Sequence, residues 1–197
     1  MITSLAKHYN FDVDTPWLYP DEATALRGQA AARSGKEGGE SSVVYLGAVG
    51  VVRMCRDLVA ETGGMVVPPH PHTGLQTVSW LFEGEVEHRD TTGAHALVRP
   101  GEVNLMTAGH GVAHSEVSTP ATTRLHGVQL WVALPDSDRE TAPAFEHHVP
   151  DVVELDGATV RTFVGSYAGS TSPVRTFTPL LGAELALHGD APVRLDL

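Results

Sequence analysis

Apolar residues occur in short runs along most of the chain, and glycine or proline separates one run from the next. Runs of about four to eight residues between such breaks are typical of strands. In EVEHRD, Val86 and His88 alternate with charged residues, which predicts a strand with one solvated face. The sequence therefore predicts an all-β protein. We expect strands from residue 43 to 54 and at 77–82, 85–90, 95–100, 102–106, 125–135, 152–165, 174–181 and 183–189.

Three short joins between these runs contain glycine. Glu83-Gly84, Thr92-Gly93 and Pro100-Gly101 each favour a tight reversal of the chain. Consecutive strands are therefore expected to pair as antiparallel hairpins. Residues 136–151 are charged and lack periodicity, which predicts a surface connection between two blocks of strands.

The first 42 residues follow a different pattern. Asp21 can cap a short helix over residues 21–33, although Gly28 interrupts it. The next stretch, residues 34–42, contains no apolar side chain and predicts a flexible loop. The N-terminus shows no basic stretch followed by an apolar core, so no signal peptide is expected.

Composition narrows the class of protein. Apolar residues make up 42% of the 197 positions, enough for a packed core, and no apolar run approaches the length of a membrane span. The net charge of −11 argues against direct binding to nucleic acid, because a phosphate backbone attracts basic proteins. The single cysteine, Cys55, cannot form an intrachain disulfide and is expected to be a buried apolar residue. We therefore predict a reduced, cytoplasmic protein.

Eleven histidines give the chain its candidate chemistry. In VVPPHPHTG, His70 and His72 lie two positions apart. In an extended segment their side chains project to the same side, about 6–7 Å apart, from where both rings can reach one ion. Pro69 and Pro71 favour extended backbone and lack N–H donors, which places this segment at a strand end or rim.

His114 and Glu116 repeat the same spacing further along the chain. The 41 residues between the two pairs suffice for four strands before the chain returns beside its start. Either pair alone is more often a surface or core feature, and only the combination of the two pairs is specific for a metal site. Three imidazoles and one carboxylate suit iron, manganese, nickel, cobalt or copper, and the spacing does not choose among these metals.

These residues resemble the cupins and, among cupins, the pirin family. The resemblance implies a bicupin whose N-terminal barrel, residues 43–124, binds one iron-like ion. The implied ligands are His70, His72, His114 and Glu116. The C-terminal block, residues 125–197, is expected to form a short or incomplete second barrel without a metal. The matching segments are HPHTGLQTV, EGEVEHRD, RPGEVNLMTAGHGVAHSE, HGVQLWVALP and VRTFTPLL, within about residues 64–181.

Two residues depart from the family pattern. Gln76 stands where a glutamate is usual, so a charge behind the metal ligands is expected to be missing. His110 stands where an arginine is common, and it is either a proton-transfer group near the mouth of the site or a surface residue. Trp80, Phe82 and Trp131 are expected in strands, where core packing is favoured over lining a ligand cavity.

The resemblance implies two functions, which the site residues alone do not separate. The first is a quercetin 2,3-dioxygenase-type oxidoreductase acting on a flavonol-like substrate with O2, in which Glu116 is both ligand and base. The second is an iron-dependent redox-sensing regulator that binds a protein partner, which the acidic charge would suit better than DNA. A metal held only for stability is the third alternative.

Overall fold

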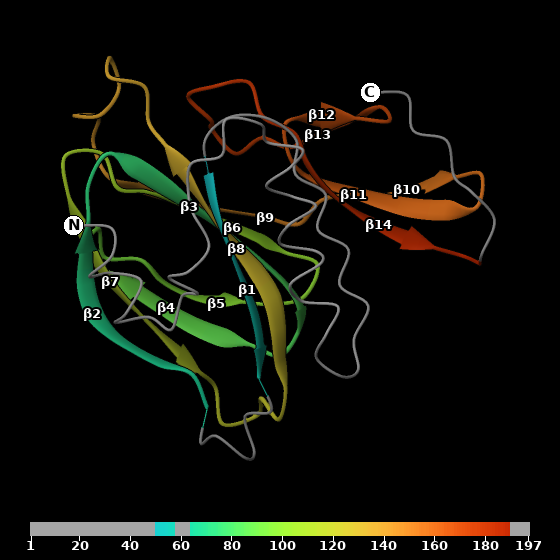
Figure 1. The fold of residues 1–197 in the computed structure, drawn as a ribbon, viewed down its shortest axis with the longest axis horizontal. Helices are drawn as coiled ribbons and strands as arrows, with labels where there is room; N and C mark the ends of the chain where they lie inside the picture. The colour runs from blue at the N-terminus through green and yellow to red at the C-terminus, as the bar shows by residue number, and fades with distance from the viewer. Residues whose placement is uncertain (1–49, 58–63, 190–197) are drawn as a thin grey trace, which may run out of the picture. The chain divides into compact units, whose positions relative to one another are not determined.

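The computed structural model describes residues 50–57, as backbone only, and residues 64–189. The described strands belong to a compact unit that spans Leu46–Leu197. All regular elements of the described residues are strands, as Figure 1 shows, and this confirms the predicted all-β class. None of the described elements is a helix that is long and apolar enough to cross a membrane. The helix predicted at 21–33 and the loop at 34–42 lie outside the described residues.

Nine strands form two antiparallel sheets that wrap into one barrel (Figure 1). The five-stranded sheet has the order β1-β8-β3-β6-β9, and the four-stranded sheet has the order β2-β7-β4-β5. The strands are β1 (Gly50–Asp57), β2 (Val66–His72), β3 (Leu75–Glu83), β4 (Val86–Asp90), β5 (His95–Val98), β6 (Val103–Thr107), β7 (Val112–Ser118), β8 (Leu125–Ala133) and β9 (Ala144–His148).

Only one of the three predicted hairpins forms. The turn at Thr92-Gly93 joins β4 to β5, and these two strands pair. The turns at Glu83-Gly84 and Pro100-Gly101 instead carry the chain from one sheet to the other, so the other two predicted hairpins were wrong. Turn chemistry specifies a reversal, but the strand that becomes a neighbour depends on long-range packing. The predicted return of the chain is confirmed, because β7 pairs with β2.

The second block of strands begins later than predicted. Strand β8 lies between β1 and β3 in the five-stranded sheet, and β9 pairs with β6. The boundary predicted between residues 124 and 125 is therefore wrong, because it separates strands that hydrogen-bond to each other. The segment 136–151, expected to be only a connection, contains β9 and completes an edge of the barrel sheet.

A smaller group of strands follows the barrel. Its three-stranded sheet has the order β10-β11-β14, and β12 pairs with β13. Residues 174–181 were predicted to be a strand but have no regular structure; Val174 is instead buried in the core that the barrel shares with this block. The bounds are β10 (Val152–Leu155), β11 (Ala158–Val164), β12 (Ser166–Tyr167), β13 (Ser170–Thr171) and β14 (Gly182–Leu187).

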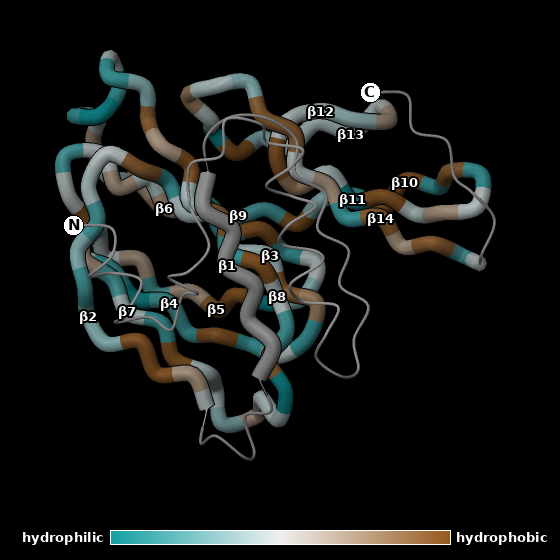
Figure 2. The backbone as a smooth tube through the Cα atoms, viewed as in Figure 1, coloured by the Kyte–Doolittle hydropathy of each residue, from teal (hydrophilic) through white to brown (hydrophobic). Residues whose placement is uncertain are grey.

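Alternation along β3 divides the core in two. Val78 and Trp80 face outward, where Trp80 stacks on Phe163 of β11 with ring centroids 4.6 Å apart. Leu81 faces the barrel interior and packs with apolar residues of β4, β5 and β8. Figure 2 shows the corresponding apolar segments both on barrel strands and on β10 and β14. Strand β3 therefore supplies one wall of the barrel and the support for the C-terminal block.

Candidate metal centre

The predicted histidine pair lies on an edge strand of the four-stranded sheet. Strand β2 carries His70 and His72, and it pairs only with β7 among the described strands. Pro69 and Pro71 lack backbone donors, so an edge position avoids lost ladder hydrogen bonds. The register places His70 directly opposite His114, with an irregularity after Val67. The rim position predicted from the prolines is what the structure shows.

Three of the predicted ligands converge. The ring centroids of His70, His72 and His114 are 4.4–5.0 Å apart. One nitrogen from each ring lies within 4.8 Å of the others. His72 and His114 are buried, whereas His70 is half-buried at the rim. The predicted projection of His70 and His72 to one side of the strand is therefore observed.

Burial keeps the two inner imidazoles neutral. Loss of solvent around the ring lowers the pKa of His72 to about 4, with a smaller contribution from the neighbouring His70. Burial likewise lowers the pKa of His114 to about 3, again assisted by nearby histidines. Both rings therefore carry a lone pair at neutral pH. The ring of His70 donates from Nδ1 to the Pro68 carbonyl oxygen over 2.9 Å, which leaves its lone pair on Nε2.

Glu116 occupies an adjoining position. Its carboxylate forms a second group with His88 and His114, whose candidate ligand atoms lie within 4.8 Å of one another. The side chain is 5% exposed and accepts a hydrogen bond of 2.7 Å from Gln129 Nε2. His114 belongs to both groups, so the structure links all four predicted residues through that ring and does not gather them into one group.

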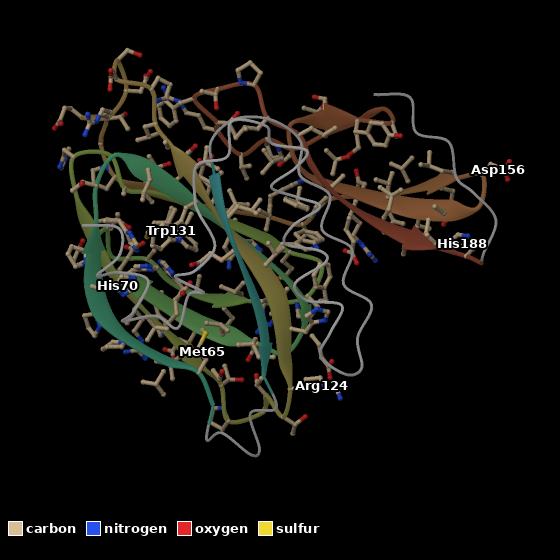
Figure 3. All side chains as sticks on the ribbon, in the orientation of Figure 1. Met65, His70, Arg124, Trp131, Asp156 and His188 are labelled. Carbon is tan, nitrogen blue, oxygen red and sulfur yellow. The ribbon has the colours of Figure 1, made fainter. Side chains whose placement is uncertain are left out.

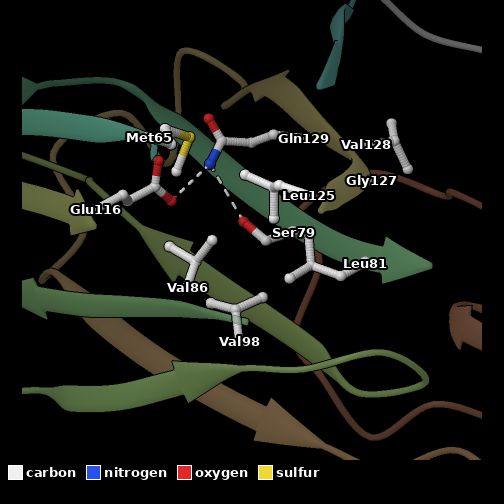
Figure 4. A pocket seen from close by; sticks show the side chains of 10 residues that line it. All are labelled: Met65, Ser79, Leu81, Val86, Val98, Glu116, Leu125, Gly127, Val128 and Gln129. Carbon is white, nitrogen blue, oxygen red and sulfur yellow. Dashed lines mark hydrogen bonds between the residues drawn. The ribbon is translucent and has the colours of Figure 1, made fainter. Parts of the chain in front are cut away.

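Gln129 orients the carboxylate of Glu116. Its Nε2 also donates to Ser79 Oγ over 3.2 Å, and its Oε1 accepts from Trp131 Nε1 over 3.4 Å. Figure 4 shows Gln129 donating to both Glu116 and Ser79 beside a cavity. Because the amide has partners at both ends, its orientation is fixed, and so is the oxygen of Glu116 that it binds.

The cavity beside Glu116 is small and apolar. Its volume is about 30 Å³, and its lining side chains, apart from Glu116, Gln129 and Ser79, are apolar. A water molecule needs about 10–15 Å³ of such space, so about two waters fit. Pockets for drug-sized ligands have volumes of about 300–1,000 Å³. This cavity therefore admits small molecules only.

His88 was not among the predicted site residues. It is 3% exposed on β4, and the register places it directly opposite Glu116 of β7. Its ring stacks on Phe145 with centroids 4.6 Å apart. The alternation in EVEHRD already placed His88 on the buried face of its strand. The strand pairing that brings it to Glu116 could not be read from that pattern.

The three aromatic residues have different positions. Trp80 is 1% exposed and packs in the core, as predicted. Phe82 is 41% exposed and lies against His126. Trp131 contacts the site, because its ring meets His72 edge-on at 5.1 Å. Figure 3 shows Trp131 and His70 on the same side of the barrel.

The two departures from the family pattern lie away from the ligands. Gln76 faces the C-terminal block and donates to Thr107 Oγ1 and to the Arg175 carbonyl oxygen, both over 2.9 Å. The predicted effect of Gln76 on the metal is therefore not supported by its position. The side chain of His110 is exposed and belongs to neither of the two histidine-containing groups.

The donor set fits a transition metal. His72 Nε2 and His114 Nε2 are 3.1 Å apart. Two nitrogens bound at about 2.1 Å to adjacent positions of an octahedral ion would be about 3.0 Å apart. Neutral imidazoles beside a buried carboxylate are also the ligand types that first-row metals prefer. The same 3.1 Å also suits a hydrogen bond between two neutral rings.

Comparison with known proteins identifies the family. Residues 41–132 match the model of the Pirin family. The chain therefore carries a pirin-family domain. A relative of this pirin named "Putative quercetin 2,3-dioxygenase PA1205", from Pseudomonas aeruginosa, is 50% identical over 137 residues, which cover 68% of this chain and 43% of the relative. A "Pirin-like protein" of Caulobacter vibrioides is 40% identical over 143 residues, which cover 65% of this chain and 50% of the relative.

Solved structures agree with this assignment. The crystal structure titled quercetin 2,3-dioxygenase from Acinetobacter baumannii superposes on this pirin with a TM-score of 0.66 at 48% identity, covering 68% of this chain and 45% of that one. The fold is therefore the all-β cupin fold of pirins. This chain spans about half the length of the curated relatives that it matches.

Proposed function

We propose that this pirin holds one divalent transition metal through His70, His72, His114 and Glu116, and that it is a quercetin 2,3-dioxygenase-type oxidoreductase. The convergence of three imidazoles on one edge of the barrel, next to a buried carboxylate, carries the proposal. Iron is the first expectation, and manganese, nickel, cobalt and copper are the alternatives. The names of two relatives support the reaction class.

Each residue has a distinct part in this proposal. A divalent ion held at this site would supply Lewis acidity toward the oxygen atoms of a flavonol. His70, His72 and His114 would hold the ion through one ring nitrogen each, and burial keeps His72 and His114 neutral. Glu116 takes the proton of the flavonol hydroxyl as general base. Gln129 binds one oxygen of Glu116 and keeps the carboxylate aimed at the site.

The substrate enters from the rim. The 30 Å³ cavity beside Glu116 cannot admit a three-ring flavonol, although it can admit O2. His70 is the half-buried member of the cluster, at the rim, whereas His72 and His114 are buried. We therefore infer that the flavonol approaches from the side of His70.

Oxygen uptake tests the proposed reaction. Metal-free protein is reconstituted separately with iron, manganese, nickel, cobalt and copper, and quercetin-dependent O2 consumption is recorded. Uptake with at least one metal is expected, together with its loss in His114→Ala. Glu116→Gln should keep part of the metal and lose turnover, and equal turnover would reject Glu116 as the base. No uptake by protein that demonstrably holds metal would reject the dioxygenase.

A redox-sensing regulator is the second candidate, and the small cavity favours it. The cavity beside Glu116 has room for small molecules only, and a regulator that reports the oxidation state of an iron to a partner needs no room for a large substrate. The net charge of −11 suits a protein partner with a basic surface. Partner capture that depends on iron oxidation, without turnover of quercetin, would support this candidate.

A further inference from the structure

A buried carboxylate and a second histidine lie behind His114. His88 Nε2 donates to Asp90 Oδ2 over 3.0 Å, and both side chains are almost completely buried. On the other side of the same ring, His88 Nδ1 lies 3.4 Å from His114 Nδ1. His114 Nε2 then faces His72. The side chains of Asp90, His88 and His114 therefore form a chain of hydrogen bonds that ends at the proposed metal site.

The hydrogen-bonding capacity of each atom fixes where the protons lie. A carboxylate oxygen only accepts, so its hydrogen bond with His88 places a proton on Nε2 of that ring. A neutral His88 then has its lone pair on Nδ1, which accepts from Nδ1–H of His114. With its proton on Nδ1, His114 presents the Nε2 lone pair toward the site.

The surroundings of Asp90 support its ionised form. Burial by itself raises the pKa of this carboxyl, but hydrogen bonds from His88, Thr92 and two backbone amides outweigh it and lower the pKa below the usual value. Oδ1 of Asp90 accepts from the Thr92 amide over 2.8 Å and from the Ala94 amide over 3.2 Å. The turn between β4 and β5 therefore holds Asp90 in place.

We propose that Asp90 and His88 are positioning residues that fix the tautomer and ring orientation of His114, so that Nε2 of His114 is the ligand atom. This inference rests on the proposed metal site and adds two residues to it. His70 obtains the equivalent support from the carbonyl oxygen of Pro68. Metal-binding histidines commonly donate their other N–H to a carboxylate or carbonyl group. Here the ring of His88 lies between His114 and the carboxylate of Asp90 and hydrogen-bonds to both.

Two other arrangements of the same atoms make different predictions. In the first, His88 is itself a ligand, since it also forms a group with His114 and Glu116. In the second, His88 carries protons on both nitrogens and donates to His114, which would place the remaining proton of His114 on Nε2 and block that ligand atom. Nuclear magnetic resonance and metal binding separate these arrangements from the proposed one.

The first measurement uses metal-free protein labelled with 15N-histidine at pH 7.5. Long-range 1H–15N correlation distinguishes protonated from bare ring nitrogens, and the variants His88→Gln and His114→Gln assign the signals. We expect His114 protonated on Nδ1 and His88 protonated on Nε2 only. A proton on Nε2 of His114, or two protons on His88, would overturn the proposal. This result does not depend on metal binding, so it is separate from the proposed function.

The second measurement is titration with cobalt(II). Asp90→Asn offers an amide N–H to Nε2 of His88, so His88 would donate from Nδ1 to His114 and the proton of His114 would lie on Nε2. This change is expected to weaken cobalt binding about 10–100-fold while one ion per chain is retained. His88→Gln is expected to weaken binding to a similar degree. Normal affinity in Asp90→Asn would overturn the proposal. Complete loss of the ion in His88→Gln alone would make His88 a ligand and would also overturn it.

Two matched variants control for structural damage. Glu87 precedes His88 in the sequence and pairs with exposed Arg89 and His95. The variant Glu87→Gln should therefore bind cobalt normally. Thr92→Ala removes a partner of Asp90 in the turn without touching His88. If Thr92→Ala weakened cobalt binding as much as Asp90→Asn, the effect would come from the turn, and the positioning role would be rejected.

Discussion

Single side chains set the proton affinity of this site through burial. The pKa of His72 lies near 4 and that of His114 near 3, below the ordinary histidine value of 6.5. A histidine whose pKa is lowered by folding binds fewer protons in the folded state than in the unfolded state. Its contribution to stability is therefore complete above pH 6.5 and is lost as the pH falls toward the folded value.

Metal-free protein should consequently lose stability on mild acidification. Between pH 6.5 and 5, above the range in which most carboxylates titrate, the melting temperature is expected to fall. His72→Gln should reduce this dependence, whereas exposed His110→Gln should leave it unchanged. Calorimetry on chelator-treated protein measures the effect, and a flat profile through this range would contradict the burial of these rings.

Gln76 gives a second prediction for a single residue. Its amide donates to Thr107 and to the carbonyl oxygen of Arg175, and the residue is 1% exposed. Gln76→Glu would place a carboxylate against that carbonyl oxygen and is expected to cost about 3 kcal/mol of unfolding free energy. Gln76→Met should cost less, because it brings no charge. Cobalt affinity should be unchanged, and weaker binding in Gln76→Glu would connect Gln76 to the metal after all.

The loop that enters β7 depends on one glycine. Gly109 has a φ of 52°, and a Cβ atom there would lie 1.9 Å from the Thr141 carbonyl oxygen. Gly93 also has positive φ, at 92°, but a Cβ there would meet no atom within 4 Å. The two positions therefore separate backbone strain from steric overlap.

Alanine substitutions test this difference. Gly93→Ala should cost about 1–2 kcal/mol through backbone strain alone. Gly109→Ala should cost about 1–3 kcal/mol more, because the Thr141 backbone has to move. Since Gly109 precedes the strand that carries His114 and Glu116, metal affinity should also fall in Gly109→Ala only. Urea denaturation and cobalt titration measure both effects, and equal losses in the two variants would contradict the overlap with Thr141.

Local patterns predicted the elements of the site better than their partners. Alternation within VVPPHPH and VAHSEVS placed His70 with His72 and His114 with Glu116, because side-chain direction in a strand depends only on position. Pairing depends on residues far apart in the sequence. For this reason the contact of His88 with His114 was missed, and two predicted hairpins were wrong. The tautomer of His114 likewise depends on Asp90, which no local pattern connects to it.

For the molecule as a whole, the barrel and the C-terminal block share one apolar core. Phe163 is 6% exposed and stacks on Trp80, whose Nε1 donates to Glu184 over 3.2 Å. The predicted boundary at residue 124 failed because β8 joins the barrel sheet through pairing that composition does not reveal. The all-β class was predictable, since strand periodicity and glycine spacing recur along the chain.

Phe163→Ala should therefore destabilise the whole unit. The lost ring is expected to cost about 3–5 kcal/mol and to lower the urea midpoint of a single transition followed by tryptophan fluorescence. Half-buried Phe177 packs under Arg175, and Phe177→Ala should cost clearly less. Two separate transitions, with the tryptophan signal unaffected by Phe163→Ala, would show that the two parts fold independently.

Metal content tests the central claim most directly. Purified protein is loaded with each candidate metal, passed through a desalting column and measured by elemental analysis, beside His114→Ala and the exposed control His110→Ala. We predict one ion per chain in the unchanged protein and in His110→Ala, and a loss of the ion in His114→Ala. An unchanged protein that retains none of these metals, or a His114→Ala variant that retains one ion per chain, would contradict the proposed site.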